Sequence, residues 1–307
     1  MAAFAANNLR LHLAVYHLHD ILTGMLARML NWGKEMCPLP EDIDLITLRR
    51  RMDTHIIGNT LMRYERVAST NDVARERART GHPEGLVVLA EEQSAGRGRL
   101  GRNWISAYGD ALLVSILLRP TWLPPGDAFA LTMMAGVALC RAVEQVAPVR
   151  ARLKWPNDLL LFVDGEWRKS AGILTEVSVA SDTVEWAIIG MGVNVNQSPV
   201  GTVNGRDLQR TATCVSAAAG QRISRAALLE ALLVAIDEHY ASLQSGERGI
   251  LFTAWRSRLA RIGEPVTVTL HNGELRGIAE DVAPDGTLLL RDADGILHQV
   301  YTGDVGF

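Results

Sequence analysis

The chain contains little cysteine, which removes two common ways of building a site or of stabilising a fold. Its 307 residues include three cysteines, Cys37, Cys140 and Cys214. They lie far apart and match neither a zinc-site spacing nor a disulfide framework. We therefore predict no metal held by protein side chains and no disulfide, and we expect a reducing, cytoplasmic environment.

The chain also lacks a strong charge of either sign. Its formal net charge is −3, whereas a broad nucleic-acid-binding surface needs clustered positive charge. We find no internal repeat and no low-complexity tract. Apolar residues make up 48% and charged residues 21% of the sequence, close to the values of an ordinary soluble protein.

A long uninterrupted apolar run is missing from residues 1–50. Apolar residues recur there at helical spacing, but His12, Asp20 and Arg28 interrupt them, which argues against a membrane span. No short apolar core precedes a small-residue cleavage site, so a signal peptide is not expected either. We interpret the segment as an extension from a mis-assigned start, with Met52 or another internal Met as the true start, and a docking helix as the alternative. No helix pair joined by a tight glycine turn is present, so no DNA-binding domain is predicted.

The rest of the chain predicts an α+β fold with two domains, residues 51–262 and 263–307. A capped helix at 73–80, a strand at 86–90 and a strand at 111–118 precede a long apolar helix at 127–147. A meander of strands follows, with Asp164-Gly165 as a hairpin turn. Further helices are expected near 213–219, 225–243 and 251–260. After Gly263, short evenly spaced strands predict a small β-barrel.

The most informative segment is Gly96–Trp104, Gly-Arg-Gly-Arg-Leu-Gly-Arg-Asn-Trp. Glycines let a backbone approach a ligand closely and direct its N–H groups inward. Arginine guanidinium groups match the oxygens of carboxylates and phosphates. The indole of Trp104 adds a flat surface for a nucleobase. The segment therefore predicts a loop that binds a small anionic ligand.

Gly96, Gly98 and Gly101 also match the dinucleotide-binding fingerprint G-x-G-x-x-G. That motif carries meaning only between a strand and a helix, because the helix N-terminus holds the pyrophosphate. Here an apolar strand precedes the loop and a second one, from Ala111 to Leu118, follows it. The dinucleotide-binding interpretation is therefore rejected.

Further polar segments recur along the chain. They are Ser69-Thr70-Asn71, Gln93, Lys154-Trp155-Pro156-Asn157-Asp158, Lys169-Ser170-Ala171-Gly172-Ile173-Leu174 and Gly190-Met191-Gly192-Val193-Asn194. Each alone has an ordinary explanation, such as a helix cap, a surface turn or a solvated lysine. The glycines of the last segment suggest that a ligand or another backbone approaches the strand.

Together and in this order, the segments resemble the biotin protein ligase family, also called biotin–acetyl-CoA-carboxylase ligases. The resemblance extends from about Met62 to the C-terminus. It implies a mixed, mostly antiparallel sheet flanked by helices, similar to the core of class II synthetases, followed by an SH3-like barrel. Leu100 stands where many members have a further basic residue, and Ser170 replaces a usual aliphatic residue.

The resemblance also implies roles for individual residues. The expected biotin-binding residues are Ser69, Thr70, Asn71, Gln93, Gly96, Arg97, Gly98, Arg99, Lys169 and Gly172. The expected ATP-binding residues are Arg102, Trp104, Lys154, Asn157 and Asn194. Lys169, Arg99 and Asp158 are the expected catalytic residues, with Asp158 orienting the acceptor amine or accepting its proton.

The implied reaction has two steps. Biotin and ATP, with Mg²⁺ on the phosphates, give biotinyl-5′-AMP and pyrophosphate, and a lysine of a biotin carboxyl carrier protein then displaces AMP. The glycine-rich loop is expected to be mobile without ligand and ordered over biotin or the adenylate. The sequence leaves open whether the chain forms a homodimer.

Three alternatives compete with this interpretation. A lipoate or octanoate ligase would share the fold and the adenylation chemistry, but that family lacks the Gly-Arg-Gly-Arg loop. A biotin-responsive repressor would need an N-terminal DNA-binding domain. A nucleic-acid binder with a basic loop would need a clustered basic face.

Overall fold

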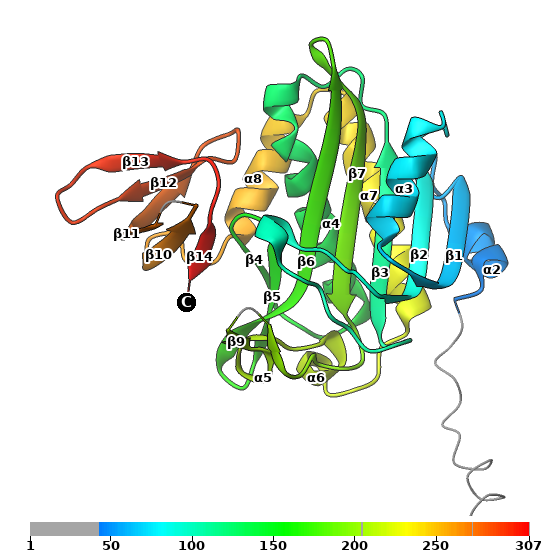
Figure 1. Ribbon diagram of the computed structural model, residues 1–307, viewed down its shortest axis with the longest axis horizontal. Helices are drawn as coiled ribbons and strands as arrows, with labels where there is room; N and C mark the ends of the chain where they lie inside the picture. Colours follow the sequence, from blue (N-terminus) through cyan, green and yellow to red (C-terminus); the bar gives the residue numbers. More distant parts are fainter. Residues whose placement is uncertain (1–42, 204, 272, 307) are drawn as a thin grey trace, which may run out of the picture. The chain divides into compact units, whose positions relative to one another are not determined.

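The computed structural model describes residues 43–203, 205–271 and 273–306, and its centre is a seven-stranded mixed sheet. The strand order is β1-β2-β3-β7-β6-β5-β4 (Figure 1). Only β1 and β2 run parallel, and the other neighbours are antiparallel. The strands are β1 (Thr60–Val67), β2 (Leu86–Gln93), β3 (Ala111–Leu118), β4 (Ala151–Lys154), β5 (Asp158–Val163), β6 (Glu166–Ala180) and β7 (Thr183–Asn194).

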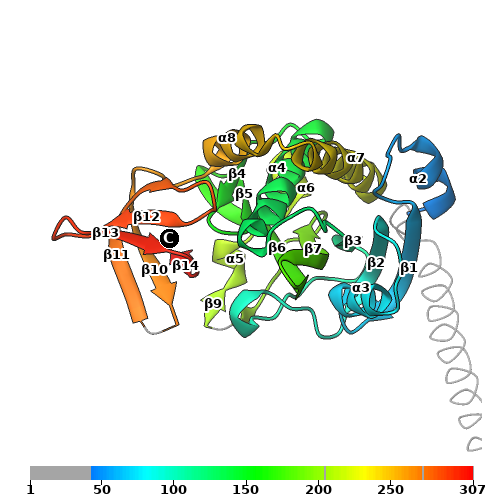
Figure 2. The ribbon, with the colours of Figure 1, turned by 90° about the horizontal axis from the view of Figure 1, so that it is seen from above.

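Helices cover both faces of this sheet (Figure 2). The helices α4 (Phe129–Val146), α7 (Arg225–Gln244) and α8 (Arg248–Arg258) pack together on one face. The helix α3 (Thr70–Arg79) packs on the other face, against β2, β3 and β7. Side chains alternate along β3, so Val114 and Ile116 enter the larger core while Leu117 joins the smaller core under α3.

The segment Pro125–Val146 is long and apolar enough to cross a membrane by composition alone. Most of it is buried inside the fold. Leu131, Met134 and Leu139 are fully buried in the larger core, and α4 as a whole packs against the sheet and α7. The segment therefore serves as the central core helix, in the position that the sequence predicts.

The smaller sheet at the C-terminal end has five antiparallel strands in the order β13-β12-β11-β10-β14. They are β10 (Pro265–Leu270), β11 (Gly273–Val282), β12 (Leu288–Arg291), β13 (Leu297–Val300) and β14 (Asp304–Gly306). Several contacts tie this sheet to the rest of the described chain, two of them around Gly286. The Trp155 indole donates to the Gly286 carbonyl at 2.8 Å, and an added Cβ on Gly286 would lie 2.0 Å from the Phe129 ring.

The short elements complete the described chain. They are α2 (Leu45–Arg51), α5 (Leu208–Thr211), α6 (Val215–Ala219) and the two-stranded pair β8 (Thr202–Val203) and β9 (Arg206–Asp207). Ile43, Leu48 and Met52 are buried in the larger core. The packed part of the chain therefore begins before the boundary expected at residue 51, and a start at Met52 would remove α2. The expectations for the earlier residues fall on 1–42, outside the described part.

Candidate active site

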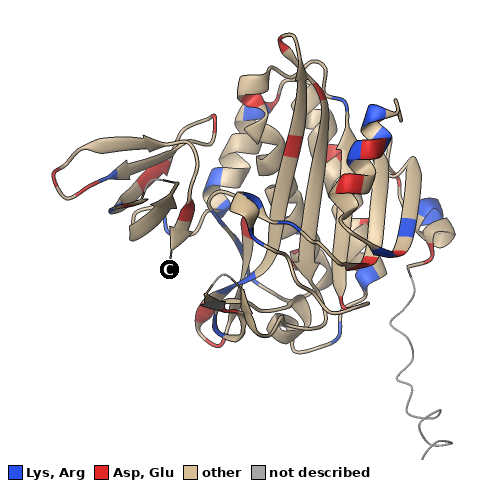
Figure 3. Ribbon diagram, in the orientation of Figure 1, with Lys and Arg blue, Asp and Glu red and all other residues tan. Residues whose placement is uncertain are grey.

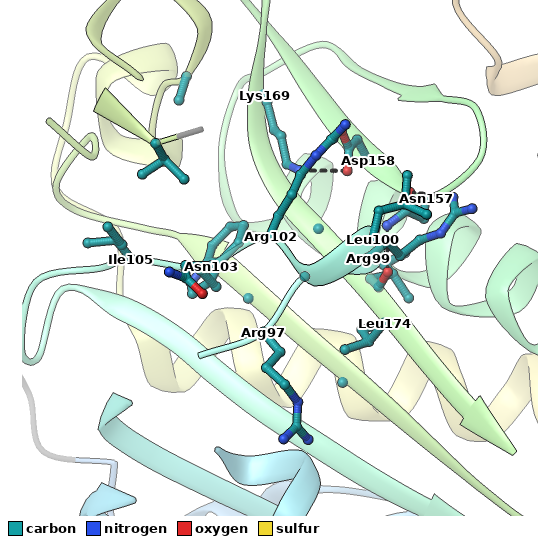
Figure 4. A pocket seen from close by; sticks show the side chains of 18 of the residues that line it. Arg97, Arg99, Leu100, Arg102, Asn103, Ile105, Asn157, Asp158, Lys169 and Leu174 are labelled. Atoms are coloured by element: carbon teal, nitrogen blue, oxygen red, sulfur yellow. Dashed lines mark hydrogen bonds and ion pairs between the residues drawn. The ribbon is translucent and has the colours of Figure 1, made fainter. Parts of the chain in front are cut away.

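A cavity of about 490 Å³ opens over β6 and β7, and it gathers nearly all of the predicted site residues. Of these residues, only Gly96 does not line it. Gly96 instead supports the loop, since its carbonyl accepts the Trp104 N–H at 2.9 Å and an added Cβ would lie 2.7 Å from the Trp104 carbonyl. Its lining comes from residues within 69–71, 93–105, 154–174 and 190–212 and from residues 303–306 at the C-terminal sheet; Figure 4 shows the central ones.

The loop Gly96–Trp104 joins β2 to β3, so it runs from strand to strand. This arrangement confirms that the glycines do not form a dinucleotide-binding turn. Arg97 pairs with Asn103 across the loop, and the Gly98 N–H donates to the Arg102 carbonyl at 2.7 Å. Leu100 and Gly101 have positive φ angles of 55° and 70° at the tip. Leu100 is strained there, because a side chain disfavours this region.

Short polar side chains line one end of the cavity at the start of α3. Ser69 is the N-cap residue of α3, but within the described chain its hydroxyl accepts no hydrogen bond from a backbone N–H of that helix. The Gln93 Oε1 accepts the Thr70 N–H at 2.8 Å and lies 3.1 Å from the Thr70 hydroxyl. The helix-cap explanation therefore does not account for Ser69, whose side chain lines the cavity instead.

Two glycines in β7 make room for site side chains. An added Cβ on Gly190 would lie 2.1 Å from Oδ1 of Asn71, and one on Gly192 would lie 2.5 Å from the Trp104 ring. The sequence suggested approach by a ligand or another backbone, and the structure corrects this: two side chains occupy the space. The Trp104 Nε1 is buried with no hydrogen-bond partner in the described chain.

The Lys-Trp-Pro-Asn-Asp segment forms the hairpin between β4 and β5. Lys154 and Asp158 are directly opposed across it, and Trp155–Pro156 is a cis peptide. The spacing of the motif therefore brings a lysine and an aspartate together in a buried position. Their side chains lie 3.4 Å apart, at 5% and 7% exposure.

Alternating charges extend from this pair in both directions. Asp158 Oδ1 lies 2.7 Å from the Nζ of Lys169, which is 35% exposed (Figure 4). Lys154 Nζ lies 3.2 Å from Asp304 Oδ1, and the other Asp304 oxygen accepts from Arg102 at 2.8 Å. Asp304 belongs to β14, so the C-terminal sheet contributes directly to the site.

The position of Asp158 argues against its expected role as a proton acceptor. Burial alone would raise the pKa of this carboxyl, but Lys169 and Lys154 outweigh burial and lower the pKa below its usual value. A carboxylate with a lowered pKa is a weak base. The geometry fits a different role, in which Asp158 holds the ammonium group of Lys169 in place.

The loop arginines do not all point into the cavity. Arg97, expected to face biotin, donates to both Asp72 oxygens, at 3.0 and 2.6 Å, and points away from Lys169 (Figure 4). Arg99 contacts Asn157 Oδ1 and the Thr302 hydroxyl, each at 3.2 Å. Burial lowers the pKa of the Arg99 guanidinium, against the opposing effect of Asp158 and Asp304.

The two asparagines expected on the ATP side bond to backbone. The Asn157 amide donates to the Ile173 carbonyl at 2.6 Å, and the Asn194 amide donates to the Thr213 carbonyl at 3.1 Å. Both residues line the cavity while holding its walls. These bonds fit a role in which Asn157 and Asn194 hold the backbone of the cavity wall in place, at least as well as direct contact with a nucleotide.

Two polar residues that the sequence motifs do not reveal are Ser115, which contacts residues lining the cavity, and Asp304, which lines it. Ser115 lies within the apolar run of β3, where only its polarity marks it. Asp304 follows Gly303 in a short strand that was not predicted. Neither position carries a local signal strong enough to assign it to the site.

The chain is similar to known proteins over most of its length. Residues 64–194 match the biotin/lipoate A/B protein ligase family, and residues 262–307 match the biotin protein ligase C-terminal domain. The bifunctional ligase/repressor BirA of Bacillus subtilis is 33% identical over 273 residues, which cover 89% of this chain and 82% of that protein. The biotin–[acetyl-CoA-carboxylase] ligase of Paracoccus denitrificans is 35% identical over 214 residues, 68% of this chain and 85% of that protein.

A solved structure agrees with the relatives. The biotin protein ligase of Aquifex aeolicus in complex with biotin and ATP superposes with a TM-score of 0.65 at 25% identity, covering 81% of this chain and 98% of that one. Sequence identity over most of the length of both relatives, a matching C-terminal domain and a shared fold lead to one conclusion. This chain belongs to the biotin protein ligase family.

Proposed function

We propose that this chain activates biotin with ATP and transfers it to a lysine of a biotin carboxyl carrier protein. One observation supports this most strongly. A lysine held by a buried carboxylate, Lys169 on Asp158 at 2.7 Å, lines the same cavity as the polar cluster of Thr70, Asn71 and Gln93. The Lys169 ammonium group can bind a carboxylate and a phosphate at the same time. The hydroxyl and amide groups of the polar cluster can form hydrogen bonds with a small polar ring.

In the first step, an oxygen of the biotin carboxylate attacks the α-phosphorus of ATP. A new O–P bond forms, the bond to the β-phosphate oxygen breaks, and pyrophosphate leaves. Two anions must approach each other, so fixed positive charge is the main requirement. We assign this to Lys169, with Arg99 and Arg102 of the loop on the nucleotide side, and we place Trp104 against the adenine.

In the second step, the neutral amine of the acceptor lysine attacks the acyl carbon of the mixed anhydride. An amide bond forms, the bond from the acyl carbon to the phosphate oxygen breaks, and AMP leaves. A free lysine is protonated at neutral pH, so the amine must lose a proton first. Asp158 does not fit as the acceptor of that proton, because two lysines hold it in its ionised form.

The expected Mg²⁺ has no ready set of protein ligands. Among the described residues, no three His, Cys, Asp or Glu side chains are grouped as a metal site requires. The ion would therefore be held by the phosphate oxygens of ATP and water. No step above depends on it.

The alternatives differ in their support. Polar side chains suited to a ureido ring and a matched biotin ligase C-terminal domain favour biotin over lipoate or octanoate. Lys and Arg are interspersed with Asp and Glu along the ribbon (Figure 3), which gives a nucleic-acid binder little support. Repressor activity depends on residues 1–60, mostly outside the described part. The absence of a DNA-binding domain and a cytoplasmic location stay predictions.

The direct test is biotin transfer. The purified protein is incubated with ATP, Mg²⁺, biotin and a biotin carboxyl carrier domain, and the mass of the carrier is measured. We expect an increase equal to one biotin on one lysine. A carrier whose acceptor lysine is replaced by arginine should gain nothing, and an unmodified wild-type carrier would refute the proposal.

A further inference from the structure

Ser115 is a polar side chain buried in an otherwise apolar strand. The strand β3 reads Ala-Leu-Leu-Val-Ser-Ile-Leu-Leu, and Ser115 has 0% exposure. Burying a hydroxyl without a partner costs free energy, so its contacts matter. Its Oγ lies 2.7 Å from the Thr70 Oγ1 and 2.6 Å from the Asn71 Oδ1. Ser115 thus contacts, from beneath, two residues that line the cavity.

The number of hydrogens restricts how these groups pair. Ser115 carries one hydroxyl hydrogen, so it donates to either Asn71 or Thr70. If it donates to Asn71, the short contact with Thr70 requires the Thr70 hydroxyl to donate to Ser115. If it donated to Thr70, no hydrogen would lie in the 2.6 Å contact between the Ser115 Oγ and the Asn71 Oδ1, so this arrangement does not fit. In the arrangement that fits, the single hydrogen of the Thr70 hydroxyl is therefore used within the protein.

The side-chain amide of Gln93 is also held in one orientation. Its Oε1 already accepts the Thr70 N–H at 2.8 Å, which fixes the orientation of the side-chain amide. The Nε2 is the part of this amide that these bonds do not use, and Gln93 lines the cavity. Toward a ligand, Thr70 therefore offers an oxygen that accepts, and Gln93 offers N–H groups that donate.

We propose that Ser115 is a positioning residue that makes the Thr70 hydroxyl a hydrogen-bond acceptor beside the donor N–H groups of Gln93. Thr70 and Gln93 together then select a ligand edge that carries an N–H next to a C=O. That edge is the edge of a cyclic urea. The inference rests on the proposed function, in which the ligand is biotin. It adds a residue that never touches the ligand but sets the hydrogen-bond direction of those that do.

The first test compares ligand affinities by titration calorimetry. Ser115→Ala should weaken biotin binding about tenfold, the effect of one lost hydrogen bond in a buried site. Desthiobiotin keeps the urea but lacks the thioether ring, so its affinity should fall by the same factor. The KM for ATP and the kcat at saturating biotin should stay unchanged, because the urea lies far from the reacting carboxylate.

A matched pair separates the hydroxyl from packing effects. Ser115→Thr and Ser115→Val add the same volume and differ only in a hydroxyl, so Ser115→Thr should bind biotin about tenfold more tightly. Tyr240→Phe removes another buried hydroxyl, which donates to Glu84 at 2.8 Å away from the cavity. That variant should keep the biotin affinity of the wild type even if its melting temperature falls.

A double-mutant cycle with Thr70→Val tests the coupling. If Ser115 acts through Thr70, then Ser115→Ala should cost almost nothing once the Thr70 hydroxyl is gone. Wild-type protein that does not bind biotin would refute the proposed function. Wild-type protein that binds biotin, with equal affinities for Ser115→Thr and Ser115→Val or additive effects in the cycle, would overturn the role of Ser115.

Discussion

The ammonium group of Lys169 lies 2.7 Å from the carboxylate of Asp158, although the two side chains come from neighbouring strands, β6 and β5. The buried carboxylate fixes the position of a cation that is still 35% exposed to the cavity. The pair is therefore the centre of the proposed adenylation site.

Replacing Lys169 should stop adenylate formation while leaving the fold intact. Lys169→Gln removes the charge that offsets the two approaching anions, so we expect kcat for pyrophosphate exchange to fall about a hundred- to a thousandfold. Arg168→Gln is the matched control, because Arg168 pairs with Glu166 on the same strand and does not line the cavity. Comparable activities of the two variants would contradict the assignment of Lys169.

Replacing Asp158 should affect both stability and catalysis. Asp158→Asn leaves Lys169 without its ion-pair partner, and we expect a loss of about 2 kcal/mol in the free energy of unfolding. Urea denaturation at neutral pH would measure it. The activity of the variant should be lower than that of the wild type by the same factor at every pH from 6 to 9, because the wild-type carboxyl does not titrate in that range.

The pH dependence of this stability follows from the lowered pKa of Asp158. A group with a folded pKa below its unfolded value stabilises the protein fully above the unfolded pKa, about 4 for aspartate. Its contribution is lost as the pH falls through the lower folded pKa. The difference in stability between wild type and Asp158→Asn should therefore be constant above about pH 5 and shrink in acid. A difference that grew as the pH fell would contradict the ion pair.

The loop should order over its ligand and retain the adenylate. Arg99 connects the loop to Asn157 and to Thr302 of the C-terminal segment. Arg99→Gly should release biotinyl-5′-AMP and biotinylate added bystander proteins, measured on a blot for biotin. Biotin should also slow proteolysis within residues 96–102 in the wild type. Unchanged selectivity together with equal cleavage rates would count against this role of the loop.

Gly190 should tolerate no side chain. An added Cβ would lie 2.1 Å from the Asn71 Oδ1, so Gly190→Ala displaces the Asn71 amide and should raise the KM for biotin more than about tenfold. Gly126→Ala is the control, because an added Cβ there meets nothing within 4 Å. Equal KM values for the two variants would show that Asn71 does not need its present position.

The helix α2 should contribute to stability. Ile43 and Leu48 are 2% and 3% exposed, so burying them stabilises the core. A chain that starts at Met52 should unfold at lower urea concentration than one that starts at Ile43, with a loss of about 2–4 kcal/mol. Equal stabilities would support Met52 as an adequate start.

The sequence predicted the strongly patterned elements well. The strand β3 begins and ends at the predicted residues, because its run of apolar side chains is continuous. Asp164 and Gly165 both have positive φ, as the predicted hairpin turn requires. The edge strand β1 was missed, since Arg63, Glu65 and Arg66 interrupt its apolar pattern and only one neighbour pairs with it.

The site was predicted in composition rather than in geometry. The motifs identified the residues that line the cavity, but not that Arg97 turns to Asp72 or that Asp158 lies between two lysines. Such partners depend on strand order, which brings together residues far apart in the chain. Asp304 lies 150 residues from Lys154, and no local pattern connects them.

The most direct test of the account is ATP–pyrophosphate exchange with three acids in parallel. Labelled pyrophosphate should enter ATP when biotin is present, and not with lipoate or octanoate, because only biotin carries a urea for Thr70 and Gln93. Exchange that requires biotin would establish the adenylation step in this cavity. Exchange with lipoate or octanoate but not with biotin would contradict the account at its centre.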